Sequence, residues 1–356
     1  MISPKTRLIG LVFLCVGLSK SVEAQEAAPS ALFSSHEVLQ LVIEADLEAL
    51  RSDRSQESED RPALLIVEGP DGSPVEVPLQ VRTRGNFRLR RDICSFPPIR
   101  LNFRKSLSTG TVFDGQDKLK LVTHCHDRTS YEQNVLEEYL AYRIFNELTD
   151  VSFRVRPVEI TYHDTRESME SLTRMGFLIE SEEEMAARLG GMALEIPGAR
   201  ATAFEPFHTG LMFVFQYFIG NIDWSTANTQ NLAVLRVGTD HFAVPYDFDW
   251  SGLVDAPYAG PSPLTERRHA RVRERLYLGV CWDAVDFHAV FRRFEEAKGA
   301  IFEAIAAVPG LSESNVESAS DYAESFYEFI EDPDRAARSL GRRCQRGGGL
   351  PSPSMY

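Results

Sequence analysis

The chain has 356 residues, of which 43% are hydrophobic and 25% charged, so it can bury a large core as one domain or as two joined lobes. Its formal net charge of −14 argues against a nucleic-acid backbone as a partner. After the N-terminal apolar run, the sequence has no segment that we expect to span a membrane.

The N-terminus has the order of charged, apolar and small residues that is typical of a secretory signal peptide. Lys5 and Arg7 precede an apolar run over residues 8–18, and a small residue, Ala24, suits cleavage. We therefore predict a signal peptide over residues 1–24 and export to the periplasm or the extracellular space. The alternative is a buried N-terminal helix.

Export places the remaining four cysteines in an oxidising compartment, where an even number favours two disulfides. Three connectivities are possible. Proximity in the sequence favours Cys94 with Cys125 and Cys281 with Cys344, and four buried free thiols are the alternative. The spacing of these cysteines does not resemble a zinc site.

In chain order, a short flexible leader over residues 25–34 is followed by a strand-rich part over residues 35–190. Alternating apolar residues and turn signals such as "GPDGS" predict most of its elements. The predicted strands cover 37–43, 63–68, 75–84, 97–103, 117–125, 153–162 and 174–181. The predicted helices cover 45–54, 131–148 and 182–190, and the second of these is long, with apolar residues at helical spacing.

The following part, residues 191–345, is predicted to be mainly helical. Helices are expected over 204–219, 282–308 and 319–344, the last interrupted near "EDPDR", with two short strands over 231–237 and 241–245. Residues 346–356 lack apolar content and are predicted to be a disordered tail. A cleft between the two parts is the expected place for a ligand.

Four polar residues stand at the ends of consecutive apolar segments. Asp223 follows the apolar helix, Asn231 opens the first short strand, and Asp247 follows the second. Asp249 adds a further carboxylate. If the strands form a hairpin, Asn231 and Asp247 emerge at the same end, and such oxygen ligands suit Mg²⁺ or Mn²⁺. Asn228 is an alternative to Asn231, and a simple hairpin turn is an alternative to a metal site.

The strand-rich part offers cations for phosphate. "KLKLV" puts Lys118 and Lys120 on one face of a strand, although either lysine could instead lie on an exposed edge. Among the glutamates of the long helix, Glu137 is our choice as the partner of such a lysine. "RTRGNFRLRR" is a basic turn, and its Arg84 and Gly85 are candidates for a phosphate-binding loop.

Residues 80–260 resemble the CotH kinase family, the atypical secreted or spore-coat protein kinases, and in particular its exported bacterial relatives. The resemblance lies in "RGNFR", "FPPIRLNF", "KLKLVTHC", the helix "YEQNVLEEYLAYRIFNEL", "GFLIE", "GNIDWS", "NLAVL" and "VPYDFDWSGLV". It implies a two-lobed, protein-kinase-like α+β fold, with a strand-rich N-lobe that carries one long helix and a helix-rich C-lobe. The Gly-rich loop of such kinases is reduced here to "RGN".

By this resemblance, Asp223 is the catalytic residue, Asn231 and Asp247 hold the metal ion with Asp249 as a further candidate ligand, and Lys120 contacts phosphate. The implied activity is transfer of the ATP γ-phosphate to Ser or Thr hydroxyls of a protein substrate, with Mg²⁺ or Mn²⁺. One alternative is a pseudokinase or extracellular binding module without turnover. Another is a metal-dependent hydrolase that uses the same carboxylates. The sequence does not indicate the oligomeric state.

Overall fold

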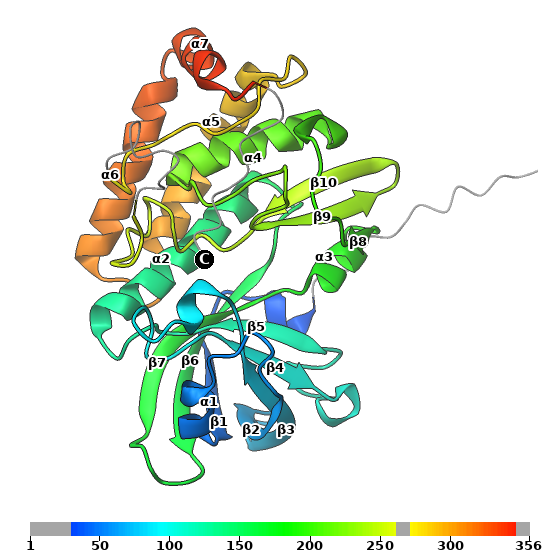
Figure 1. The fold of residues 1–356 in the computed structure, drawn as a ribbon, viewed down its shortest axis with the longest axis vertical. Helices are drawn as coiled ribbons and strands as arrows, with labels where there is room; N and C mark the ends of the chain where they lie inside the picture. Colours follow the sequence, from blue (N-terminus) through cyan, green and yellow to red (C-terminus); the bar gives the residue numbers. More distant parts are fainter. Residues whose placement is uncertain (1–29, 261–270, 347–356) are drawn as a thin grey trace, which may run out of the picture.

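The computed structural model describes residues 30–260 and 271–346 (Figure 1). The predicted signal peptide, residues 1–24, and residues 347–356 of the predicted tail lie outside the described residues. The last residues of the predicted leader are described, and they include the 3-10 helix η1, Ala31–Phe33. Because Leu32 and Phe33 are buried in the core of the barrel, this part of the leader is packed.

Seven strands close into a barrel in the order β1-β2-β3-β4-β5-β7-β6, at the lower end of the molecule in Figure 1. Neighbouring strands pair antiparallel, except that β1 and β6 pair in parallel, with Leu41 opposite Ile160, and so close the ring. The strand bounds are β1 Leu39–Ala45, β2 Arg61–Glu68, β3 Pro74–Thr83, β4 Ile99–Phe103, β5 Lys118–Val122, β6 Val155–Asp164 and β7 Leu172–Ile179.

The barrel interior is one of two hydrophobic clusters. It forms because side chains of a strand alternate between its two faces: in β4, Ile99, Leu101 and Phe103 are buried while the residues between them are partly exposed. Two short elements lie beside the barrel: α1, Leu47–Ser52, which is capped by the side chain of Asp46, and the 3-10 helix η3, Lys105–Leu107.

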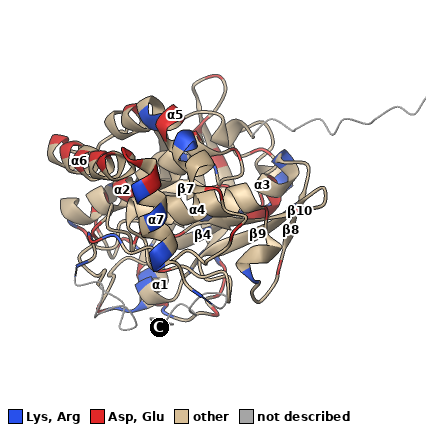
Figure 2. Cartoon of the chain, turned by 90° about the horizontal axis from the view of Figure 1, so that it is seen from above, with Lys and Arg blue, Asp and Glu red and all other residues tan. Residues whose placement is uncertain are grey.

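The larger cluster is formed by the helices above the barrel in Figure 1. Their bounds are α2 Thr129–Leu148, α4 Pro206–Ile219, α5 Phe287–Ala306, α6 Glu313–Ile330 and α7 Pro333–Arg343. Helix α2 packs against β7 of the barrel and against α5, so it joins the two clusters. Figure 2 shows acidic residues, in red, along α6, in keeping with the negative net charge.

The ends of α4 are fixed by local chemistry. The Glu205 side chain accepts hydrogen bonds from the first turn, and Pro206 occupies the first helical position, where its missing N–H costs nothing. Gly220 ends the helix with a φ of 67°, and a Cβ there would lie 2.3 Å from the hydroxyl of Tyr322. The chain therefore leaves α4 abruptly, three residues before Asp223.

A small antiparallel sheet in the order β10-β9-β8 lies beside α4. Its strands are β8 Met192–Leu194, β9 Leu232–Val237 and β10 Asp240–Pro245. The hairpin of β9 and β10 was expected, but β8, with three residues, was not. Helix α3, Glu182–Arg188, and the 3-10 helix η4, Ala201–Ala203, connect β7 to this sheet and α4.

The expected two-lobed protein-kinase-like fold is wrong. Within the described residues, the strand-rich part is a closed, mixed seven-stranded barrel, and the second part combines helices with a three-stranded sheet. The alternation of apolar residues predicted the individual strands well. It does not determine which strands pair, and the parallel pairing of β1 with β6 links residues more than a hundred positions apart.

Both predicted disulfides are confirmed. Cys94 is joined to Cys125, and Cys281 to Cys344. The first ties the loop after β3 to the start of the connection between β5 and α2, and the second ties the segment before α5 to the end of α7. Of the helices in residues 30–260 and 271–346, none combines the length and apolarity needed to cross a bilayer.

Candidate functional site

The β9–β10 hairpin brings Asn231 and Asp247 to the same end of the small sheet, as expected. Leu232 pairs with Pro245, and the next residues continue the ladder, since the N–H of Tyr246 donates to the carbonyl oxygen of Asn231 at 3.0 Å. Both Asn231 and Asp247 adopt a left-handed backbone, with φ of 52° and 62°. Asn and Asp tolerate this conformation better than most residues, which explains their presence at these two positions.

Asp223 and Asn231 form a buried pair. The Nδ2 of Asn231 donates to both the main-chain oxygen of Asp223 at 2.7 Å and its carboxylate at 3.0 Å. The N–H of Asp223 donates to the side chain of Asn221, which is fully buried. With Nδ2 engaged, Oδ1 is the atom of Asn231 that can bind a cation. The alternative, Asn228, is exposed, whereas Asp223 and Asn231 are buried.

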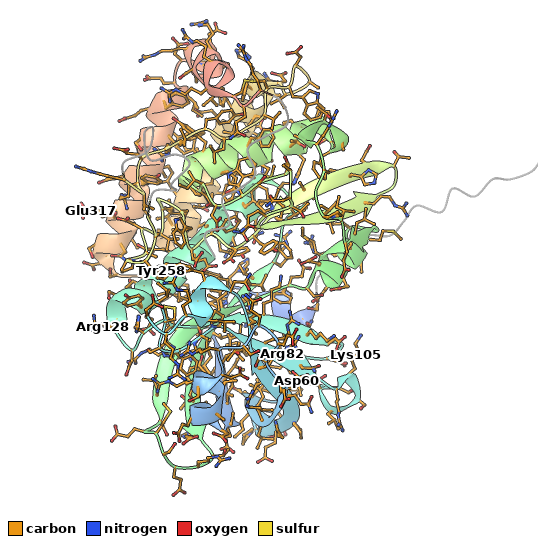
Figure 3. All side chains as sticks on the ribbon, in the orientation of Figure 1. Asp60, Arg82, Lys105, Arg128, Tyr258 and Glu317 are labelled. Atoms are coloured by element: carbon orange, nitrogen blue, oxygen red, sulfur yellow. A yellow bond between two sulfur atoms is a disulfide. The ribbon has the colours of Figure 1, made fainter. Side chains whose placement is uncertain are left out.

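A buried arginine connects three carboxylates at the centre of the site. Arg88 lies in the 3-10 helix η2, Phe87–Leu89, and its guanidinium is 3.6 Å from Glu138, 3.5 Å from Asp247 and 3.4 Å from Asp249. Asp249 also accepts a hydrogen bond from Tyr258, which Figure 3 labels near the junction of barrel and helices.

Burial dominates the electrostatics of this cluster. It raises the pKa of Glu138 to about 8 and also raises the pKa of Asp249, in both cases against the attraction of Arg88. For Arg88 itself, burial works against the charged form, but Asp249 and the other acidic groups around it hold its pKa well above the ordinary value. Asp247 is the most accessible of the three carboxylates, with a third of its side chain (34%) exposed.

Two more cations approach Asp247 from the barrel. The ammonium of Lys120 in β5 lies 3.5 Å from Glu182 of α3 and 4.6 Å from the centre of the Tyr246 ring. Burial, together with the nearby charge of Arg84, lowers the pKa of Lys120, while Glu182 and Asp247 oppose this shift. Burial likewise lowers the pKa of Arg84, and Asp247 opposes it.

Two of the predicted residues, Glu137 and Lys118, have their contacts outside this cluster. The carboxylate of Glu137 accepts hydrogen bonds from Asn134 at 3.1 Å and from Asn315 of α6 at 2.9 Å, and burial raises its pKa to about 7. The expected ion pair of Glu137 with Lys120 is therefore absent, and Glu182 takes its place. Lys118 is exposed and lines a separate pocket beside α3.

Gly85 is exposed, with a φ of 95° and no atom within 4 Å of the position of a Cβ, so ligand atoms can approach its backbone closely. It adjoins Arg84, which places the predicted "RGN" turn next to the cluster. The sequence pattern identifies Arg88 only as part of a basic turn and Glu138 only as one glutamate of a helix. It does not distinguish either residue from its neighbours of the same kind, because that depends on which side of each element faces the site.

A pocket of about 370 Å³ adjoins Lys120 through Glu182. Its walls come from β8, β9 and the chain around them, and the apolar members include Leu194, Leu232 and Val234, with Tyr246 at the side of the lysine. The volume lies within the range of ~300–1,000 Å³ that pockets for small organic ligands occupy.

The described residues contain no group of three or more His, Cys, Asp or Glu side chains arranged to hold a metal ion. The candidate donors at the hairpin end are instead Oδ1 of Asn231 and the carboxylate of Asp247. This set of hard oxygens fits Mg²⁺ or Mn²⁺, which commonly take few protein ligands and complete their coordination with water and phosphate oxygens.

Searches with the whole chain found no matching family model and no matching curated protein.

Proposed function

We propose that the protein is an exported phosphotransferase that uses ATP with Mg²⁺ or Mn²⁺ and phosphorylates Ser or Thr hydroxyls of a protein. The observation that carries this proposal is that Lys120 of the barrel lies 4.6 Å from the centre of the ring of Tyr246, the residue before Asp247 at the end of the hairpin, while the charge of Asp247 also acts on Arg84. Cations beside an acidic, oxygen-rich loop are what a triphosphate and its metal ion require. The resemblance to the CotH kinase family supports the same chemistry.

In this proposal, Lys120 and Arg84 contact the phosphate oxygens, and Asn231 and Asp247 hold the metal ion. When bound, the ion neutralises part of the charge on the phosphates. Asp223, fixed by Asn231, orients the acceptor hydroxyl and takes its proton. The acceptor oxygen forms a bond to the γ-phosphorus, the bond from that phosphorus to the β,γ-bridging oxygen breaks, and ADP leaves.

The pocket beside Lys120 suits the base of the nucleotide. Leu232 and Val234 present apolar side chains to a flat ring, and Tyr246 lies between this pocket and the ammonium of Lys120. Glu182 lines the same pocket and pairs with Lys120, so it joins the base region to the phosphate region.

A second candidate function is binding without turnover. The observation that favours it is Arg88, which already lies between Asp247 and Asp249 and balances their charge without a metal ion. In such a protein, this arrangement of side chains would stabilise the fold and would not catalyse a reaction. The compartment also favours it, because exported space normally lacks ATP.

The two candidates differ in how the oxidised protein responds to ATP with Mg²⁺ or Mn²⁺. We expect a metal-dependent rise in melting temperature, because a ligand at one hundred times its Kd stabilises the native state by about 2.7 kcal/mol. Lys120→Met should abolish the shift. Lys118→Met is the matched control, since Lys118 lies on the same face of the same strand but is exposed.

A second step tests turnover. Asp223→Asn should keep the ATP-dependent shift and lose ADP formation in the presence of protein acceptors. Binding without ADP formation by the unaltered protein would support the second candidate, and phosphate release without an acceptor would indicate a hydrolase. An unaltered protein that responds to no nucleotide with either metal would contradict the phosphotransferase proposal.

A further inference from the structure

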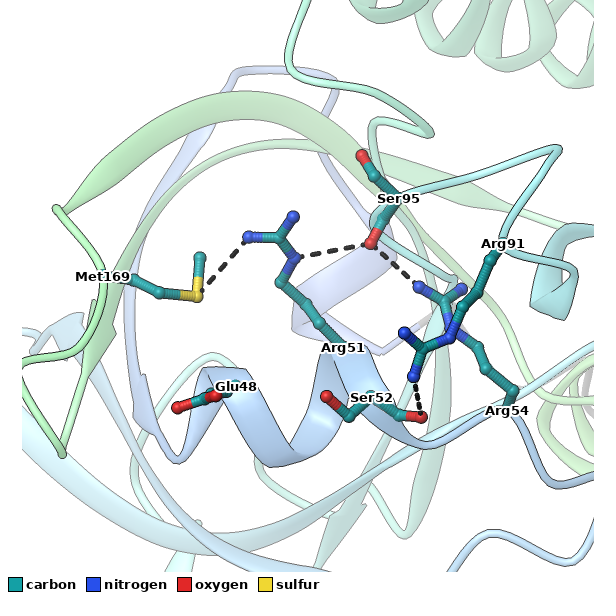
Figure 4. A pocket seen from close by; sticks show the side chains of 7 residues that line it. All are labelled: Glu48, Arg51, Ser52, Arg54, Arg91, Ser95 and Met169. Atoms are coloured by element: carbon teal, nitrogen blue, oxygen red, sulfur yellow. Dashed lines mark hydrogen bonds between the residues drawn. The ribbon is translucent and has the colours of Figure 1, made fainter.

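A second pocket, on the side of the barrel, contains three arginines. Arg51 and Arg54 come from α1 and the turn after it, Arg91 comes from the loop after η2, and Met169 closes the pocket from the β6–β7 connection (Figure 4). The proposed phosphotransferase site makes no use of this pocket. We propose that it binds a phosphate or sulfate group through these three guanidinium groups.

None of the three arginines forms a salt bridge within the described part of the chain. Arg51 donates to the carbonyl oxygen of Ser95 at 3.4 Å, and Arg91 donates to that of Ser52 at 3.1 Å. Arg54 donates to the carbonyl oxygens of Leu89, Cys94 and Ser95 at 3.3, 3.1 and 3.0 Å. Its Nε is buried without a hydrogen-bond partner. These contacts orient the guanidinium groups without pairing them with a carboxylate, although Glu48 lines the same pocket.

The charged residues next to these arginines in the sequence form ion pairs with other residues. Asp53, between the two α1-side arginines in sequence, forms a salt bridge with Arg61 at 2.8 Å, and Arg90 forms one with Asp92 at 2.6 Å. Burial and the like charges of Arg91 and Arg51 lower the pKa of Arg54, so the three positive charges act on one another. The chain has 52 Asp and Glu residues against 38 Lys and Arg residues, so carboxylates are abundant as ion-pair partners. Three arginines that share one pocket without such a partner in the described residues therefore indicate a site for a bound anion.

The chemistry of the pocket selects a compact oxyanion. Guanidinium groups bind phosphate and sulfate oxygens with pairs of parallel hydrogen bonds. The pocket has a volume of about 260 Å³, below the range of ~300–1,000 Å³ for pockets that enclose drug-sized ligands. It therefore fits a single phosphate or sulfate group with some water. Glu48 also lines the pocket, and its charge disfavours a long polyanion.

The pocket touches the loop that carries the basic residues of the phosphotransferase site. Arg54 holds the carbonyl oxygens of Leu89 and Cys94, which follow Arg88 closely in the chain. Arg91 is three residues from Arg88. A bound anion would therefore hold this loop at a second place, apart from the contacts of Arg88 with its carboxylates. This consequence for the site rests on the proposed function, whereas anion binding does not.

Isothermal titration of the oxidised full-length protein with inorganic phosphate and with sulfate, at constant ionic strength in chloride, tests the proposal. We expect saturable binding that weakens at least tenfold in Arg51→Gln and in Arg91→Gln. Arg292→Gln, which removes an equal charge from an exposed position on α5, should bind as the unaltered protein does. The binding that Arg51→Gln and Arg91→Gln lose should be retained in Lys120→Met, which separates this pocket from the proposed nucleotide site.

O-phosphoserine distinguishes the two sources of the anion. Tighter binding than that of inorganic phosphate indicates a phosphate carried by a larger ligand, and equal binding indicates the free ion; either supports the pocket. Arg91 is exposed, so its variant is expected to fold, and its melting temperature in chloride verifies this. Absence of saturable binding, or equal binding by all four variants, would overturn the proposal.

Discussion

Asn231 holds Asp223 by two hydrogen bonds from one nitrogen, to the main-chain oxygen at 2.7 Å and to the carboxylate at 3.0 Å. Asn231→Asp removes both and places two carboxylates in contact. We expect the free energy of unfolding at pH 8 to fall by about 2 kcal/mol or more, since hydrogen bonds to charged groups contribute ~1.5–3 kcal/mol. Urea unfolding measures this.

The matched control for this pair is Asn228→Asp, the same change at an exposed position three residues earlier. It should alter the free energy of unfolding by less than ~0.5 kcal/mol. Lowering the pH to 5 should restore part of the stability of Asn231→Asp, because one carboxyl of the new pair can then carry a proton. Equal stability of the two variants would show that the Asp223–Asn231 contact is unimportant.

Arg88→Met leaves Glu138 and Asp249 buried without their cation. Removing one partner of a buried charge pair typically destabilises a protein by ~3–5 kcal/mol, and we expect a loss in this range. Arg82→Met is the control, because the side chains of the Arg82–Asp60 pair, 3.8 Å apart and labelled in Figure 3, are each about one-third exposed (34% and 32%), and such surface pairs contribute at most ~1 kcal/mol. Chemical denaturation of both variants gives the comparison, and similar losses would mean that Arg88 is dispensable to the fold.

Glu137 makes stability depend on pH. Its pKa is raised from an ordinary value of 4.5 to about 7 by burial, so the folded protein binds this proton more tightly than the unfolded chain does. The free energy of unfolding should therefore fall as the pH rises from about 4.5 to about 7, and this contribution should then stay constant. Glu137→Gln should remove that part of the pH dependence and be more stable than the unaltered protein at pH 8.

The comparison for Glu137→Gln is Glu317→Gln, an exposed position on the outside of α6 (Figure 3). Denaturation curves at pH 5 and pH 8 provide the readout. If both variants keep the pH dependence of the unaltered protein, Glu137 is ionised in the folded state throughout this range, contrary to the prediction.

The two disulfides should differ in their effect on nucleotide binding. Their cysteines are 31 and 63 residues apart, and loops of this size contribute about 4 kcal/mol each to stability in the chain-entropy view. Cys94 also anchors the loop that carries Arg88, whereas Cys344 ends α7, remote in sequence from the site. We expect replacement of Cys94 and Cys125 by Ser to weaken the ATP-dependent thermal shift, and replacement of Cys281 and Cys344 to leave it intact at a temperature where both proteins are folded.

The sequence predicted local structure well where one face of an element is apolar. Helix α2, expected over residues 131–148, begins at Thr129 and ends at Leu148, and the hairpin that presents Asn231 and Asp247 is present. The disulfides were found because only four cysteines had to be paired. Strand β8 was missed because three residues are too few to establish an alternating pattern.

The sequence could not predict which residues from distant parts of the chain come into contact. Glu137 and Glu138 are neighbours, and a rotation of about 100° on the helix decides which of them faces Arg88. The partner of Lys120, Glu182, comes from a helix 62 positions later and not from α2. The barrel depends on the parallel pairing of β1 with β6, for which the amino-acid pattern of either strand contains no signal.

The closure of the barrel also removes sheet edges to which a second chain could pair. A ring of strands leaves no free edge on which another chain could add a strand. The small sheet has two edges. On β10, the outward carbonyl oxygens of His241 and Ala243 accept hydrogen bonds from Glu205 and His208 at the start of α4. The other edge is β8, whose three residues offer too short a template, so the sheet edges within the described residues are protected against aggregation.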